Sequence, residues 1–228
     1  MQTTASEYFA SMIESYDSLI RRAVPRYDEM LERLVAYLPE RAERILELGC
    51  GTGNFSLALA RRYPDADIAF IDAAPEMLDA TRRRLEEFAP DSAARFRFLP
   101  VRFEEIDPAL GAFDLIVSTI SLHHVRDKKP LYVRIAALLR DVGTFRFSDQ
   151  LRGGTEENHR INWEAWLAFC RQPGHCSPDE IESLLQHAEA HDHYTPLGEH
   201  VRLLENAGFR HVDCVWRNWI WGIVTAEK

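Results

Sequence analysis

Glycines and acidic residues stand at spacings that suit a bound nucleoside. The segment 47–53 reads Glu-Leu-Gly-Cys-Gly-Thr-Gly, so a glycine occupies every second position after Glu47. Glycine lets the backbone turn sharply and approach a ligand closely, and a helix that follows offers unpaired N–H groups. Asp72 comes 25 positions after Glu47, where a carboxylate at the end of a second strand accepts hydrogen bonds from ribose hydroxyls. The pattern predicts a nucleoside-binding loop.

The spacing of the glycines indicates which class of nucleoside ligand the loop binds. The dinucleotide fingerprint is G-x-G-x-x-G, whereas this loop reads G-x-G-x-G. The difference favours an adenosyl ligand without a pyrophosphate. Cys50 lies inside the loop, where we expect it to pack closely rather than to act as a nucleophile.

Two adjacent histidines are the candidate catalytic residues. His123 and His124 follow an apolar stretch that is predicted to be a strand, at the edge where such folds bind ligands. The pKa of a histidine lies near working pH, so either one could act as a general base. The alternative is that a histidine here only packs or bonds to the backbone. Of the two, we favour His123.

A second group of histidines resembles a metal motif only in part. His187, His191 and His193 form an H-x-x-x-H-x-H pattern, and the first two would share one face of a helix. A solvated helix or a wall of the substrate pocket explains the pattern as well. We therefore predict no metal site from the sequence.

The elements that must position these residues alternate between strand and helix. Strands are expected over 44–48, 67–72, 96–99, 113–119, 144–147, 211–215 and 219–225, and helices over 55–62, 75–88, 129–140 and 201–206. Strict alternation predicts a parallel sheet with helices on both faces. The expected fold is α/β, a Rossmann-like doubly wound, mostly parallel sheet of seven strands. We expect one domain over 1–228, with a helical cover over 1–40 and a helical insertion over 155–195 near the substrate pocket.

Composition excludes several classes of protein. The net charge of the 228 residues is −9, which disfavours nucleic acid as a partner because phosphate binding needs a basic surface. No apolar run is long enough to span a bilayer, and the first residues do not read as a secretory signal. The four cysteines form no CxxC pair, which indicates a reduced, cytoplasmic protein. The apolar N-terminal helices leave a homodimer open.

These motifs together resemble the class I S-adenosylmethionine-dependent methyltransferases. The resemblance covers about 25–150 and the last strands, and rests on ILELGCGTGNFS, IDAAPEML, FDLIVSTISLHHV and the late AGF. It implies S-adenosyl-L-methionine as cofactor, S-adenosyl-L-homocysteine as product, and direct transfer of a methyl group to a small-molecule acceptor. The implied cofactor contacts are Gly49, Cys50, Gly51 and Gly53 at the methionine end, Asp72 at the ribose, Ala73, Met77, Arg102 and Phe103 near the adenine, and Ser118 at the methionine portion. Arg102 stands where the family often has an acid.

A second resemblance concerns the tRNA uridine carboxymethyltransferase group. It rests on RAVPRY at 22–27 and on the tail DCVW to Ala226, and implies that Tyr27 contacts the cofactor. That group holds a carboxylated cofactor with an arginine just before its late A-G-F, but the matching position here is Leu203, one residue from Arg202. We therefore expect ordinary S-adenosylmethionine.

Three residues are candidates for contact with the acceptor. Trp163 and Trp166 lie three positions apart in the predicted insertion, which in this family often covers the substrate; packing in the core is the alternative. Arg22 could hold a substrate carboxylate, or lie at the surface.

The functional alternatives are a tRNA-modifying methyl or carboxymethyl transferase and a non-catalytic S-adenosylmethionine-binding protein.

Overall fold

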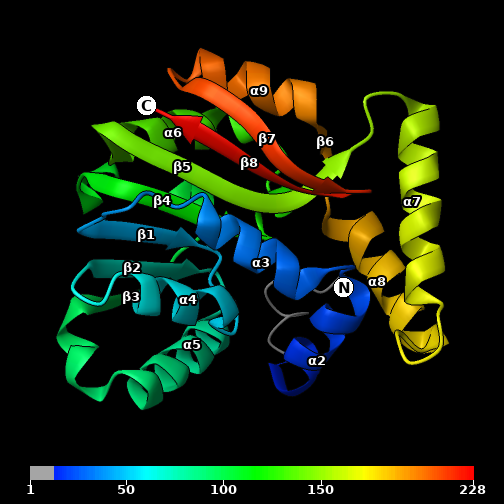
Figure 1. Cartoon of the computed structure of the whole chain (residues 1–228), viewed down its shortest axis with the longest axis horizontal. Helices are drawn as coiled ribbons and strands as arrows, with labels where there is room; N and C mark the ends of the chain where they lie inside the picture. Colours follow the sequence, from blue (N-terminus) through cyan, green and yellow to red (C-terminus); the bar gives the residue numbers. More distant parts are fainter. Residues whose placement is uncertain (1–12) are drawn as a thin grey trace.

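The computed structural model describes residues 13–228, and one twisted sheet runs through it (Figure 1). The order of the strands is β3-β2-β1-β4-β5-β8-β7. Their bounds are β1 (Arg44–Leu48), β2 (Asp67–Asp72), β3 (Phe96–Pro100), β4 (Phe113–Thr119), β5 (Leu139–Arg152), β7 (Arg210–Asn218) and β8 (Trp221–Glu227). The first five strands are parallel, whereas β8 is antiparallel to both β5 and β7. A two-residue strand, β6 (Thr195–Pro196), pairs with the end of β5. The predicted Rossmann-like fold is confirmed, with β6 as an addition to the seven expected strands.

Helices cover both faces of the sheet (Figure 1). Their bounds are α2 (Ile13–Ala23), α3 (Tyr27–Ala36), α4 (Asn54–Arg62), α5 (Pro75–Phe88), α6 (Lys128–Leu138), α7 (Glu156–Cys170), α8 (Pro178–His191) and α9 (Leu197–Asn206). Short 3-10 turns lie at η1 (Pro90–Arg95), η2 (Phe103–Glu105), η3 (Pro108–Leu110) and η4 (Leu122–His124). The buried residues form one cluster with α3, α4 and α5 and another with α6 and α9.

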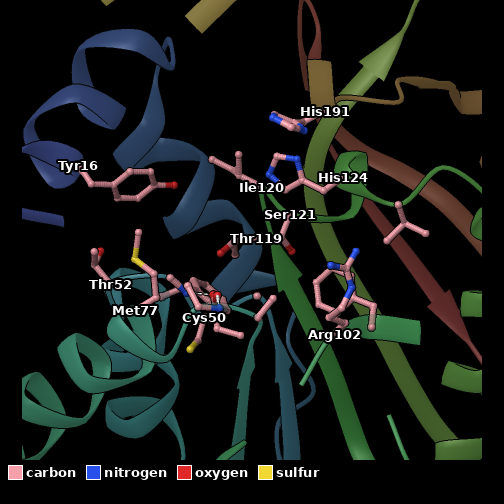
Figure 2. A pocket seen from close by; sticks show the side chains of 18 of the residues that line it. Tyr16, Cys50, Thr52, Met77, Arg102, Thr119, Ile120, Ser121, His124 and His191 are labelled. Carbon is pink, nitrogen blue, oxygen red and sulfur yellow. Dashed lines mark hydrogen bonds between the residues drawn. The ribbon is translucent and has the colours of Figure 1, made fainter. Parts of the chain in front are cut away.

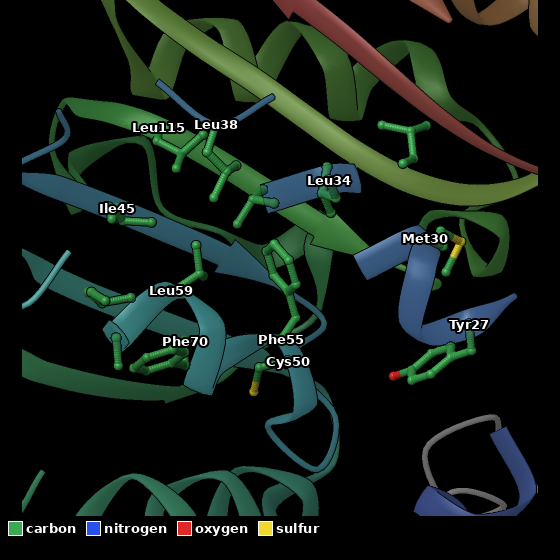
Figure 3. Packing of buried hydrophobic residues seen from close by; sticks show 14 of the residues in the cluster. Tyr27, Met30, Leu34, Leu38, Ile45, Cys50, Phe55, Leu59, Phe70 and Leu115 are labelled. Carbon is green, nitrogen blue, oxygen red and sulfur yellow. The ribbon is translucent and has the colours of Figure 1, made fainter. Parts of the chain in front are cut away.

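The strand β1 shows how the sequence supplies both clusters. Successive side chains of a strand point to opposite faces. Ile45 therefore packs with Leu34, Phe55 and Leu59 in the first cluster (Figure 3), whereas Leu46 belongs to the second. A strand that is buried on both faces is mostly apolar, as β1 is, with Glu47 as its buried acid.

The N-terminal helices and the inserted helices pack against each other. The Trp166 side chain on α7 donates a hydrogen bond through Nε1 to the Ala23 carbonyl at 2.8 Å. Arg22 on α2 pairs with Glu180 on α8 at 2.7 Å. The two segments thus form one wall beside the carboxyl ends of the central strands. The part of the predicted cover at residues 1–12 lies outside the described residues. No helix within residues 13–228 is long and apolar enough to cross a membrane.

The largest difference from the sequence expectation is the length of β5. The expected strand over 144–147 extends in the structure from Leu139 to Arg152, and α6 ends at Leu138 rather than at Arg140. The strand β5 pairs with β4 on one side and with β8 on the other. Residues 144–148 of β5 have partners on both sides, whereas the ladder with β4 shifts register between Leu139 and Thr144. Asp141 and Gly143, which on their own favour a turn, lie in that irregular stretch.

Candidate active site

A cavity of about 480 Å³ opens at the carboxyl ends of β1, β2 and β4 (Figure 2). The order of the strands reverses between β1 and β4, and in open α/β sheets ligands bind at such a switch point. Among the predicted cofactor residues, those that line the cavity are Tyr27, Gly49, Cys50, Gly51, Asp72, Ala73, Met77, Arg102 and Phe103. The structure therefore brings together segments that are separated by up to 76 positions in the sequence.

The glycines of the loop have different tasks. Gly49, Gly51 and Gly53 have φ angles of 70°, 55° and 87°, which side chains rarely adopt. A Cβ at Gly49 would lie 2.5 Å from the Ser121 side chain, whereas a Cβ at Gly51 would meet no protein atom within 4 Å. Gly51 thus exposes its backbone to the cavity, as a ligand that approaches the loop requires. Gly53 does not line the cavity; it packs against Thr81 and begins α4.

Asp72 holds the loop and faces the cavity. Its Oδ2 accepts a hydrogen bond from the Gly51 N–H and its Oδ1 one from the Ala74 N–H, both at 2.9 Å. Burial raises the pKa of Asp72, and these two N–H groups oppose that rise. Each carboxylate oxygen has capacity for a further hydrogen bond. A vicinal diol in the cavity therefore fits this side chain.

Glu47, the first residue of the motif, lies beneath the loop and has no exposed surface. Its Oε2 accepts a hydrogen bond from the Ser56 hydroxyl at 2.6 Å. Burial raises the pKa of Glu47 to about 8; the Ser56 hydrogen bond opposes the rise, and the Asp72 charge adds to it. The carboxyl group is therefore protonated at neutral pH.

Ser118 occupies a different place from the predicted one. It does not line the cavity, because its side chain is fully buried behind Ser121. Its hydroxyl contacts the Leu48 carbonyl at 3.0 Å and the Ser121 hydroxyl at 2.7 Å. Ser121, which the sequence did not single out, reaches the cavity instead. Ser118 thus positions the lining residue.

At the outer rim of the cavity, Arg102 is exposed. Its guanidinium lies 3.7 Å from the Glu104 carboxylate. Arg202, by contrast, lies on α9 and pairs with Glu199 there, and it does not line the cavity.

The two adjacent histidines face different surroundings. His123 is buried: its backbone N–H donates to the Asp149 Oδ2 at 2.9 Å and its Nδ1 lies 2.5 Å from the Asp149 Oδ1. Burial alone would lower the pKa of His123, but the Asp149 and Asp192 carboxylates raise it. His124 lines the cavity, and burial together with the neighbouring His123 lowers its pKa. The histidine that meets the cavity is therefore His124, whereas the sequence favoured His123.

A smaller cavity of about 70 Å³ adjoins the first, and Tyr16 and Ile120 line both. Its lining is mostly apolar and comes from α2, α7, α8 and β8, with His123 and Asp192 on one side. Ile120 has a φ of 51°, a conformation that is costly for a β-branched residue and that occurs at functional sites. Ile120, which lies beside His124 in Figure 2, is thus shared by the two cavities.

Of the three residues predicted to contact the acceptor, only Trp166 lines either of the two cavities. Trp166 lines the smaller cavity. Trp163 lines neither of the two cavities and packs on Trp166, with ring centroids 4.8 Å apart. Arg22 is held by Glu180 and by the His175 carbonyl, which is 2.7 Å away, so it joins α2 to α8.

Asp17, which was not predicted to have a role, anchors the N-terminal helices to the glycine loop and to α5. Asp17 on α2 accepts hydrogen bonds from the Thr52 hydroxyl at 2.6 Å and the Asn54 amide at 2.8 Å. Arg84 on α5 pairs with the same carboxylate, and its three partners lower the pKa of Asp17 against the effect of burial. No local pattern marks Asp17, because all of its partners are distant in sequence.

Comparison with known proteins shows similarity to methyltransferases. Residues 46–145 match a family described as a methyltransferase domain. The chain is 26% identical over 220 residues to the carboxy-S-adenosyl-L-methionine synthase of Nautilia profundicola, covering 92% of this chain and 89% of that protein. It is 33% identical over 129 residues to the trans-aconitate 2-methyltransferase of Methylobacterium radiotolerans, covering 55% of this chain and 45% of that one.

Solved structures share the fold. A phosphoethanolamine N-methyltransferase 2 of Haemonchus contortus in complex with S-adenosyl-L-methionine has a TM-score of 0.69 at 15% identity, covering 98% of this chain and 58% of that chain. An O-methyltransferase family protein of Burkholderia thailandensis has a TM-score of 0.67 at 16% identity, covering 97% and 62%. This chain thus spans about three fifths of these solved chains.

Proposed function

Because the chain is a class I S-adenosylmethionine-dependent methyltransferase, we propose that it methylates a hydroxyl group of a small molecule at the boundary of its two cavities. The observation that carries this proposal is the position of His124. It lines the cofactor-sized cavity, while its neighbour His123 lines the smaller one. An acceptor that reached between them would place its nucleophile beside a titratable side chain.

S-adenosylmethionine supplies an activated methyl group on a sulfonium, which an in-line nucleophile displaces. The chain's own task is to hold two ligands in that geometry and to exclude water. Asp72 would bind the ribose hydroxyls, and the Gly49–Gly51 backbone would border the methionine end. Ala73, Met77 and Phe103 would enclose the adenine.

The smaller cavity supports an acceptor with an apolar part. Trp166, Leu19 and Ile20 line it, and they offer no hydrogen-bonding group to this space beyond the indole N–H that Ala23 already accepts. Its volume of about 70 Å³ is well under the roughly 150 Å³ of a cavity that binds benzene. An alkyl group therefore suits it better than a whole ring. The acceptor would place this group behind Ile120 and its hydroxyl toward His124, which would deprotonate it as a base or through a bound cation.

The experiment that tests the ligand assignment is calorimetric titration with S-adenosylmethionine. We expect Asp72→Asn to weaken binding about tenfold or more, because the variant loses a charge-assisted hydrogen-bond pair. The matched control is Asp65→Asn, at an exposed position outside the cavity. Equal affinities of a folded Asp72→Asn and the control would refute the ribose assignment.

The acceptor is tested by methyl transfer. We expect S-adenosylhomocysteine to form with alkyl-bearing hydroxy acids or small alcohols and not with tRNA. Turnover with tRNA would contradict the small-molecule proposal, and tight cofactor binding without transfer to any acceptor would contradict an enzymatic role. A homodimer, which the sequence leaves open, is tested by light scattering, and the cytoplasmic location predicted from the sequence is tested by fractionation of cells.

A further inference from the structure

We propose that His123, His124 and Asp192 form a binding site for one divalent transition-metal ion beside the cofactor cavity. The two histidines belong to the turn η4 after β4, and Asp192 follows the last residue of α8. The sequence pattern had drawn attention to a different set, His187, His191 and His193. The site itself stands on geometry alone, whereas its catalytic role rests on the proposed function.

The three side chains converge on one point. The Asp192 Oδ1 lies 3.7 Å from the His123 Nε2 and 3.1 Å from the His124 Nδ1. One ligand atom from each residue lies within 4.8 Å of the others. Bonds of 2.0–2.2 Å to a tetrahedral ion place two ligand atoms about 3.3 Å apart. The two distances from Asp192 bracket that separation, so modest side-chain movement would suffice to coordinate an ion.

The far sides of two of the three ligands, His123 and Asp192, are held by other residues. Asp149 binds the His123 Nδ1, which leaves Nε2 toward the shared point. The Tyr194 hydroxyl donates to the Asp192 Oδ2 at 2.6 Å, which leaves Oδ1 toward it. A carboxylate behind a histidine is the usual support of a metal-binding imidazole. The His193 N–H also donates to the His123 carbonyl at 2.7 Å and so ties the two ligand-bearing segments together.

The local charge favours a cation. The side chains of Asp149 and Asp192 are 1% and 4% exposed, and a buried carboxylate requires compensation. Lys128, which is bonded to the Val125 and His193 carbonyls, supplies one positive charge nearby. One negative charge remains, which favours a cation at the same place. The competing account is a proton on His123 shared between the two carboxylates, and the two accounts differ in whether a metal binds.

The position of the site gives the ion a role. His124 borders the larger cavity, and His123 and Asp192 border the smaller one. Three protein ligands leave a coordination position for an acceptor hydroxyl, whose pKa the ion would lower. The O–H bond breaks and its proton goes to solvent; the oxygen then forms a bond to the methyl carbon as the sulfur–carbon bond breaks. The ion would thus select acceptors whose hydroxyl can bind a metal, such as 2-hydroxy acids.

The test measures metal binding without any acceptor. The full chain is stripped with a chelator and titrated with Zn²⁺ by calorimetry and with Co²⁺ by visible absorption. We expect one ion per chain with micromolar or tighter affinity. His124→Gln and Asp192→Asn should each weaken binding about 100-fold or more, and Tyr194→Phe, which removes only a supporting hydrogen bond, about tenfold. The control is His211→Asn, at an exposed position where asparagine tolerates the φ of 50°.

The outcomes separate this proposal from the proposed function. Absence of a bound ion at 100 µM metal, or binding that both ligand variants leave unchanged, would overturn the metal site. If the metal-free protein transfers methyl groups at an undiminished rate, the ion has no catalytic role, and the proposed methyltransferase function is unaffected. If His124→Gln does not fold, Tyr194→Phe carries the comparison. Stoichiometric, variant-sensitive binding in a chain that transfers no methyl group would uphold the site and refute the function.

Discussion

Replacing Glu47 with glutamine should make the protein more stable at high pH relative to the natural chain. The Glu47 side chain is buried without exposed surface, and its pKa is raised to about 8 from an ordinary value of 4.5. Between these values the folded chain holds one proton more than the unfolded chain. Its free energy of unfolding therefore falls as pH rises through this window. Glutamine has nearly the same shape and does not titrate.

The size of the effect follows from the pKa difference. One group in this window changes the free energy of unfolding by about 1.4 kcal/mol per pH unit. From pH 5.5 to 7.5 the natural chain should therefore lose about 3 kcal/mol relative to Glu47→Gln. The loss of hydrogen-bond geometry in the variant adds an offset that is the same at each pH.

The assay is urea unfolding of both chains at pH 5.5, 6.5 and 7.5. Histidines that titrate in the same range affect both chains equally and cancel in the difference. Glu43→Gln, at an exposed position just before β1, should follow the natural chain at every pH. If the curves of the natural chain and Glu47→Gln run parallel, Glu47 is not held protonated beneath the loop, and the burial argument is wrong.

Two further predictions concern the loop and the inserted helices. Gly49→Ala should destabilise the fold by about 2 kcal/mol or more, through the positive φ and the 2.5 Å approach to Ser121; Gly51→Ala, which meets no atom within 4 Å, should lose only about 1 kcal/mol. Equal losses in urea unfolding would show that Ser121 does not restrict Gly49. Arg22→Gln removes the partly exposed Glu180 pair and should lower stability by about 1 kcal/mol or less, with cofactor affinity unchanged by calorimetry. A rise of the acceptor KM without loss of stability would support contact of Arg22 with a substrate carboxylate, which the sequence left open.

The sequence predicts best what is determined by local pattern. The run ahead of the glycines is mostly apolar because β1 is buried on both faces, and its bounds at Arg44 and Leu48 are those of the expected strand. The helix that begins at Pro75 likewise has its expected bounds, since proline suits a first turn. The strand β5 was underestimated because its later residues pair with β8 as far as Gln150 and with β6 at Leu151 and Arg152, which no local pattern reveals.

Residues whose roles depend on distant partners could not be identified in this way. Asp17 has an ordinary helical context, and its importance comes from Thr52, Asn54 and Arg84. Asp192 lies 68 positions beyond His124, and only the packing of α8 against the carboxyl edge of the sheet brings the two within 3.1 Å. Ser118 was placed correctly at the end of β4, yet its side chain turns behind Ser121.

The pair His123–His124 shows why neighbouring identical residues take different roles. Both lie in one 3-10 turn, where successive side chains point in different directions. The one that turns toward β5 meets Asp149, which binds both its backbone and its ring. The His124 side chain, which points in another direction, lines the larger cavity. A single acid on β5 thus holds His123 in the interior and leaves His124 to line the larger cavity, and the sequence of the turn does not reveal this acid.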